Sequence, residues 1–119
     1  MPKKEKIEEF INTALGSSGT MASIILLIDK AIILIKEIRE KPEAQNENSR
    51  RVRNILAQLQ MALNYSEGKD TESLFTLYDY LFQEMQIGDA HSLDSAQKLL
   101  TQLRSTFKEL KKRIISESR

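Results

Sequence analysis

The chain has 119 residues, room for a single domain, and its 18 Lys and Arg against 17 Asp and Glu leave a net charge of +1. This balance provides no overall attraction to nucleic acid or to an anionic membrane. Cysteine is absent, which excludes disulfides, thiol nucleophiles and thiolate metal sites. Four glycines, two prolines and a single valine are too few for a typical sheet protein, so we predict an all-α fold.

Residues 5–15 place apolar side chains at helical spacing and predict a short amphipathic helix. The Gly-Ser-Ser-Gly run at 16–19 supplies flexibility and no packing, so it is interpreted as a linker. The whole chain, residues 1–119, is therefore expected to be one domain. In it, residues 1–19 form an N-terminal segment with its linker, and residues 20–119 form a helical bundle.

Four long helices are predicted after the linker, over about residues 21–40, 48–64, 70–86 and 92–116. Gly88 and Asp89 are expected to end the third of them. Helices of this length joined by short connections favour an antiparallel four-helix bundle. The small polar residues expected to cap the four helices are Ser18 or Thr20, Asn46 or Asn48, Asp70, and Ser92.

The last three helices each carry one apolar stripe whose members are three or four residues apart, as a bundle core requires. The predicted core residues are Val52, Ile55, Leu56, Leu59 and Leu63, then Leu74, Leu77, Tyr78, Leu81 and Met85, then Leu93, Ala96, Leu100, Leu103, Phe107, Leu110 and Ile114.

The longest apolar stretch, residues 24–38, resembles a membrane anchor in its hydrophobicity alone. Asp29 and Lys30 interrupt its centre, whereas a membrane span needs about 20 apolar residues in succession. The charged start of the chain also differs from a secretory signal, because it mixes both signs and precedes no clear cleavage site. We therefore expect a soluble cytoplasmic protein with no membrane insertion.

The first long helix has more apolar surface than one core needs. A complete stripe is already formed by Ile24, Ile28, Ala31, Ile35 and Ile38, and six further apolar residues lie beside or behind it: Ile25, Leu26, Leu27, Ile32, Ile33 and Leu34. A helix that is apolar nearly all round is normally buried on all sides. One interpretation is that it lies centrally and residues 5–15 cover the surplus.

The other interpretation is a groove for an amphipathic helix of a partner, with residues 5–15 as a movable lid on their Gly-Ser tether. In the third long helix, Phe75 and Phe82 are seven residues apart and displaced from the core stripe, so they can contribute to the same groove. The predicted groove residues are Leu26, Leu27, Ile33, Leu34, Phe75, Tyr78 and Phe82.

His91 is the only histidine, and residues 90–96 faintly resemble the Ala-His-x-Leu-Lys-Gly motif of histidine phosphotransfer domains. Asp94 replaces the lysine that would neutralise a phosphoryl group, and Ser95 replaces the glycine. No acid precedes His91 at Glu-x-x-His spacing, so no metal site is expected. We predict no catalytic residues and no cofactor. The alternative function is a four-helix-bundle adaptor or a signalling protein similar to phosphotransfer domains.

Residues 55–68, followed by Leu74 and the Leu-Tyr-Asp-Tyr run at 77–80, resemble the flagellin-specific export chaperones of the FliS family. That family carries "aLn-(x)-eGg…L-x-x-LYDY" between its second and third helices. Residues 25–31 likewise resemble its "LMLYDGA" segment and residues 102–107 its "eLRxaW" segment. The departures from the family pattern include Ile28 for a tyrosine, Lys30 for a glycine and Phe107 for a tryptophan, and the paired N-terminal tyrosines correspond to Ile7 and Phe10.

The resemblance implies a cytoplasmic bacterial chaperone that binds the disordered C-terminal segment of flagellin. Such a chaperone keeps flagellin from polymerising early and delivers it to the flagellar type III export gate. A disordered client can fold as helices along an apolar groove, and the entropy cost of ordering it keeps binding reversible. The resemblance also implies that the N-terminal segment occupies the groove when no client is bound, with Ile7, Phe10, Ile11 and Leu15 as its anchors.

Overall fold

Four long helices account for nearly all of the described residues, which in this computed structural model are 18–63 and 69–117. No strand occurs among these residues, and the predicted all-α fold is confirmed. The elements in chain order are α2 (Ser18–Glu40), the 3-10 helix η2 (Pro42–Ala44), α3 (Gln45–Met61), α4 (Lys69–Ile87) and α5 (Ala90–Glu117).

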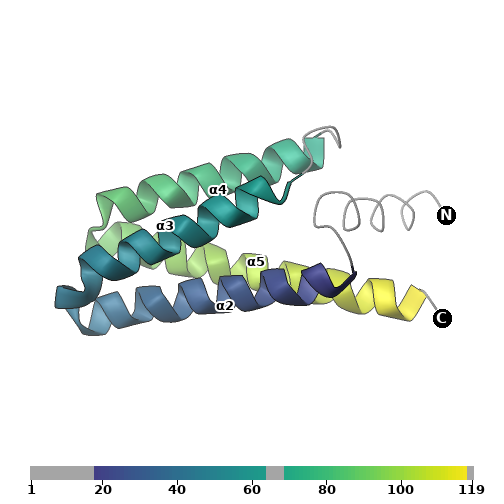
Figure 1. Cartoon of the computed structure of the whole chain (residues 1–119), viewed down its shortest axis with the longest axis horizontal. Coiled ribbons are helices and arrows are strands. Elements are labelled where there is room, and N and C mark those ends of the chain that lie inside the picture. Colours follow the sequence, from purple (N-terminus) through teal and green to yellow (C-terminus); the bar gives the residue numbers. More distant parts are fainter. Residues whose placement is uncertain (1–17, 64–68, 118–119) are drawn as a thin grey trace.

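Each helix packs against two others and runs antiparallel to both (Figure 1). Helices α2 and α4 each pack against α3 and α5, so α2 and α4 lie diagonally across the bundle. Short connections between successive helices impose this up-and-down order. None of the described helices is long and apolar enough to cross a membrane.

The core follows the predicted stripes closely. All five stripe residues of α2 are buried, as are all five predicted in the α3 segment. In α4 the stripe is buried from Tyr78 onward, while Leu74 and Leu77 are half-buried against the core. In α5 it is buried as far as Phe107 and half-buried at Leu110, and the side chain of Ile114 lies outside the part that the structure describes. The 3.6-residue period of a helix thus accounts for most of the packing.

The connection between α2 and α3 differs from the prediction. Pro42 opens a 3-10 turn rather than a loop, and Ala44 stands at the N-cap position of α3 without a side-chain cap. Asn46 and Asn48 are therefore inside the helix, and their predicted capping role is wrong. Asn48 is buried and its Nδ2 donates to the Leu34 carbonyl oxygen at 3.2 Å, because this turn of α3 lies directly against α2.

Gly88 ends α4 as predicted, with its N–H donating to the Glu84 carbonyl oxygen at 2.9 Å. The predicted cap Ser92 is buried in the first turn of α5, and Asp89 provides the cap instead. The Asp89 carboxylate accepts a hydrogen bond from the Ser92 N–H at 2.7 Å. A carboxylate three residues before a helical N–H satisfies one of the free donors that every helix start leaves.

Two further boundaries differ. Helix α2 begins at Ser18, so residues 18 and 19 of the predicted linker are helical and neither Ser18 nor Thr20 precedes the helix as a cap. Helix α4 begins at Lys69, which places the predicted cap Asp70 inside it. The predicted helix at 5–15 lies outside the described residues.

Candidate functional site

Six large apolar side chains are exposed on the described surface, and several fall into pairs seven residues apart. Leu26 and Ile33, 67% and 61% exposed, form one such pair on α2, here named the α2 apolar pair. Phe75 is exposed and Phe82 half-buried on α4, and these two are named the α4 aromatic pair. Residues seven apart project from the same side of a helix, so each pair forms a short apolar strip. The remaining exposed apolar residues are Met61, Tyr80 and Ile87.

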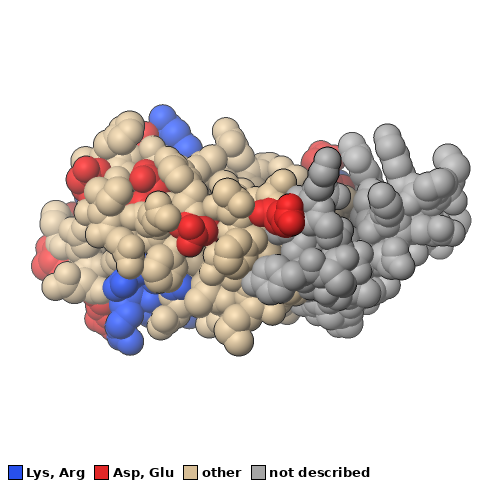
Figure 2. All heavy atoms as spheres, turned by 90° about the horizontal axis from the view of Figure 1, so that it is seen from above, with Lys and Arg blue, Asp and Glu red and all other residues tan. Residues whose placement is uncertain are grey.

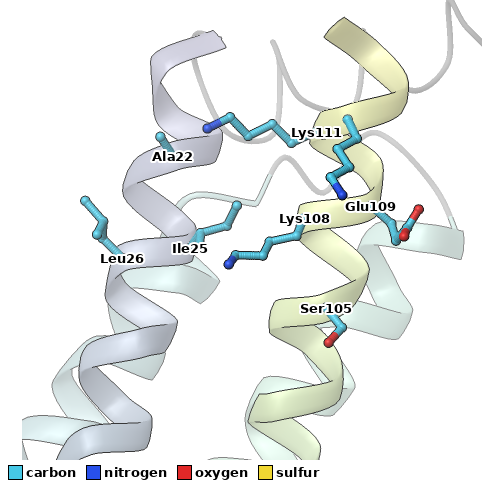
Figure 3. Close-up of a pocket in the computed structure, with 8 residues that line it drawn as sticks. Ala22, Ile25, Leu26, Ser105, Lys108, Glu109 and Lys111 are labelled. Atoms are coloured by element: carbon cyan, nitrogen blue, oxygen red, sulfur yellow. The ribbon is translucent and has the colours of Figure 1, made fainter. Parts of the chain in front are cut away.

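Beside the α2 apolar pair lies a cleft of about 710 Å³ between α2 and α5, here named the α2–α5 cleft. Figure 3 shows Ile25 on α2 pointing toward α5, and the Lys108 side chain extending from α5 toward α2. Leu26 also lines the cleft, and in Figure 3 its side chain projects from α2 on the side away from α5. The cleft is lined by Ala22, Ile25 and Leu26 from α2 and by Ser105, Lys108, Glu109, Lys111 and Lys112 from α5.

Three polar contacts join α2 to α5 along the seam that continues from this cleft. Asp29 and Arg104 form an ion pair in which the side chains are 31% and 35% exposed. Arg39 contacts α5 at two points, Asp94 at 3.3 Å and the Gln97 side-chain oxygen at 2.8 Å. Asp29 lies one helical turn beyond Ile25 and Arg104 one turn before Lys108, so this pair joins the two helices about one turn along from the residues that line the cleft.

The α4 aromatic pair borders α3 rather than α2. The Arg53 guanidinium lies over the Phe82 ring, 6.0 Å from its centroid, in cation–π contact. The Gln60 amide donates to the Phe75 carbonyl oxygen at 3.4 Å. Figure 2 views the molecule from above Figure 1, where α4 is uppermost, and shows mainly uncharged residues with scattered acidic side chains and with basic side chains at its edges. Charged side chains of both signs therefore border a mostly uncharged side.

The structure does not bring the seven predicted groove residues into one groove. Leu26 and Ile33 are exposed on α2, whereas the α4 aromatic pair lies beside α3 on the diagonally opposite helix. Leu27 is half-buried against the core. Binding of a partner by any of these residues stays a prediction.

Leu34 and Tyr78 belong to the core, with 4% and 1% of their surfaces exposed, so neither lines a surface groove in this conformation. The backbone of Leu34 faces α3, as its bond with Asn48 shows, and Tyr78 lies in the middle of the α4 core stripe. Burial also raises the pKa of the Tyr78 hydroxyl well above its ordinary value, because the charged form would be poorly solvated.

The predicted lid anchors Ile7, Phe10, Ile11 and Leu15 lie outside the described residues, so their role stays a prediction. Sequence analysis gave no binding role to the exposed Tyr80 and Ile87, which are seven residues apart and off the α4 stripe, and no part in binding is proposed for them. Nothing in the sequence shows that the lysines of the cleft, Lys108, Lys111 and Lys112, face α2.

The phosphotransfer alternative gains no support from the surroundings of His91, which is exposed in the first turn of α5. Asp94, one turn further on, accepts from Lys98 at 3.0 Å, and this hydrogen bond, followed by the charges of Lys98 and Arg39, lowers the pKa of its carboxyl. A carboxylate held in its charged form would repel a phosphoryl group on His91. Across residues 18–63 and 69–117, no cluster of three or more His, Cys, Asp or Glu is suited to hold a metal ion.

A helical bundle with apolar strips on separate sides has the features of a protein-binding module. Comparison with protein families shows to which family this module belongs, because the family model described as Flagellar protein FliS matches residues 11–114. The chain belongs to the FliS family, as the motifs in its sequence indicated. Comparison with curated proteins and with solved structures finds no match.

Membership supports a general role as a flagellar export chaperone with a protein client, and this family is one of chaperones, not of enzymes. The structure also relates two of the motifs that indicated the family. Asp29 comes from the segment similar to "LMLYDGA" and Arg104 from the segment similar to "eLRxaW", and these two residues form the α2–α5 ion pair. The charged residues of both motifs therefore contact each other between α2 and α5.

Proposed function

We propose that this protein is a cytoplasmic chaperone that binds the disordered C-terminal segment of flagellin and holds it until export through the flagellar type III apparatus. The observation that carries the proposal is the exposure of the α2 apolar pair and the α4 aromatic pair on diagonally placed helices of a FliS-family bundle. A folded partner presents one contact surface, whereas a disordered segment can wrap around the bundle and contact both.

The energetics suit a reversible complex. Covering one exposed leucine, isoleucine or phenylalanine stabilises a complex by roughly 1.5–3 kcal/mol before costs. Ordering the client offsets about 2–5 kcal/mol or more of the total. The α2 apolar pair and the α4 aromatic pair are thus enough to hold the client and to cover apolar residues through which it would otherwise self-assemble. Binding of this strength also allows the client to leave when the export gate takes it.

Calorimetry with the C-terminal peptide of flagellin from the same organism tests this proposal. The unmodified protein is expected to bind the peptide. The variant Leu26→Ser/Ile33→Ser is expected to bind it roughly 10-fold to 100-fold more weakly, since two apolar contacts are lost. Absence of binding by the unmodified protein would overturn the proposal.

Ile87→Ser is the matched control for that variant. It makes the same kind of change at an exposed residue, on the flank of α4 away from the aromatic pair. We expect its affinity to stay within about twofold of that of the unmodified protein. An equal loss in control and test variants would mean that the α2 apolar pair has no specific role.

We further propose that the N-terminal segment competes with the client through Ile7, Phe10, Ile11 and Leu15. The full-length variant Ile7→Ser/Phe10→Ser should then bind the flagellin peptide about threefold to tenfold more tightly, because a competing internal ligand is weakened. Asn12→Ser in the same segment is the control and should leave the affinity unchanged. Unchanged or weaker binding by the double variant would contradict a competing lid.

A further inference from the structure

We infer that the α2–α5 cleft recognises an acidic amphipathic helix of a partner protein, with one large apolar side chain entering the cleft and carboxylates facing the lysines of α5. The inference rests on the proposed function only in the identity of the protein that supplies the helix. It adds the chemistry of the segment that is recognised, which neither family membership nor the exposed apolar side chains of the bundle specify.

The inner wall of the cleft is apolar and largely preformed. Ile25 is only 7% exposed and belongs to the core, so it provides a fixed wall, while Leu26 adds an exposed edge. The volume of about 710 Å³ falls among those of ligand sites, roughly 300–1,000 Å³. A leucine or phenylalanine from a partner would be buried against Ile25 and Leu26.

The opposite wall of the cleft is strongly basic. Lys108, Lys111 and Lys112 line it against a single carboxylate, Glu109. Within the described part of the chain, none of these three lysines forms an ion pair. Three cations within about one helical turn, with no ion pair among the described residues, attract a partner with acidic residues at matching spacing.

The shape of the site favours a helix over other anionic ligands. The lysines stand on one wall and the apolar residues on the other, which matches a segment with an apolar side and an acidic side. A single-stranded nucleic acid would need aromatic side chains for stacking, and the lining has none. The chain's own residues 1–17 carry three lysines and three glutamates, so they offer no net charge to complement this wall.

The absence of cysteine makes a site-specific probe simple. A solvent-sensitive fluorophore on Ser105→Cys would report occupancy of the cleft, and the same label on Asn54→Cys, exposed on α3, would be the control. The ligands are three synthetic amphipathic helices with one leucine face and glutamate, glutamine or lysine on the other. We expect the glutamate peptide to bind about tenfold more tightly than the glutamine peptide, with the emission change at position 105 alone.

Charge variants then test the lysines. Lys108→Gln/Lys112→Gln should remove most of the preference for glutamate, whereas Arg50→Gln/Arg51→Gln, the same change of charge at exposed residues of α3, should leave it intact. Raising the salt from about 50 mM to about 500 mM should reduce the preference in the unmodified protein. Equal binding of the glutamate and glutamine peptides, or an equal effect of both double variants, would overturn the inference.

Occupation of the cleft by another ligand gives a different result. If the chain's own N-terminal segment or a second copy covers the cleft, the label at position 105 would already be shielded and no peptide would change its emission, and the inference would be wrong. The flagellin peptide is measured with the same samples. Binding of flagellin without a glutamate preference would defeat this inference alone, and a glutamate preference without flagellin binding would defeat the proposed function alone.

Discussion

Gly88 shows how one residue sets the corner between α4 and α5. Its φ of +66° lies in the left-handed region that disfavours side chains, and its carbonyl oxygen accepts from the Gln45 side-chain amide at 2.6 Å. A Cβ at this position would also collide with that amide. The corner thus depends on glycine for its conformation and for the close approach of α3.

Gly88→Ala is therefore expected to lower the free energy of unfolding by about 1–2 kcal/mol. Urea denaturation followed by circular dichroism measures the change. Gln45→Ala removes the hydrogen bond to the Gly88 carbonyl oxygen but leaves the backbone unstrained, so it should lower the free energy of unfolding by less than Gly88→Ala does. A Gly88→Ala protein as stable as the unmodified one would show that the corner tolerates a side chain.

Asp89 makes part of the stability depend on pH. The hydrogen bond from the Ser92 N–H, more than the nearby charge of His91, lowers the pKa of Asp89 from its ordinary value of 3.8. A carboxyl whose pKa is lower in the folded than in the unfolded state stabilises the fold at every pH above its ordinary, unfolded pKa. That contribution is lost as the pH falls through the pKa of the folded state.

Asp89→Asn should accordingly melt at a lower temperature than the unmodified protein at pH 7, with the difference shrinking below pH 3.8. Thermal melts at both pH values measure it, with the exposed Glu37→Gln on α2 as the control. A difference that persisted in acid would mean that the asparagine disturbs the cap geometry rather than the charge.

At the scale of elements, the seam between α2 and α5 combines apolar packing with cross-helix polar contacts. Asp29 pairs with Arg104 and Arg39 with Asp94, so the two helices are joined at points separated along their length. Ion pairs between helices favour one register of α2 against α5, because each charged side chain has to meet its partner. The register in turn places the lysines of α5 beside Ile25.

A double-mutant cycle on Asp29→Asn and Arg104→Gln should give a coupling of about 1 kcal/mol in the free energy of unfolding, since the pair is only partly shielded from water. Urea denaturation of the four proteins measures it. The Asp94–Lys98 pair within α5 provides the comparison and should couple more weakly. Additive effects of Asp29→Asn and Arg104→Gln would show that the pair contributes nothing to the seam.

At the scale of the molecule, the diagonal placement of α2 and α4 separates the two apolar strips and determines how a client can bind. Leu26→Ser and Phe75→Ser each remove one contact on helices that do not pack extensively against each other. Effects at distant, independent sites add in free energy, so the losses of affinity for the flagellin peptide should multiply in the double variant. Calorimetry tests this, and a loss confined to one strip would contradict a client that contacts both.

The helices and their core stripes were predictable because local spacing determines which side of a helix is apolar. The caps were not. Asn48, Ser92 and Asp70 are good capping residues by type, yet Asn48 and Ser92 are buried and Asp70 lies inside α4. A capping preference of about 1 kcal/mol is small beside the packing of a whole helix, so packing can override it, as it does at Asn48 and Ser92.

The amino-acid sequence by itself determined the all-α class, the four helices, the core stripe of each and the motifs of the FliS family, since all of these depend on residues close together in the chain. Only the tertiary structure decided which surplus apolar residues stay exposed. It buries Leu34 and Tyr78, leaves Leu26 and Ile33 at the surface, and places Lys108 across from Ile25. The physical reason is that these outcomes depend on the order of the helices around the bundle and on the rotation of each about its axis. Both are set by contacts between residues far apart in the chain.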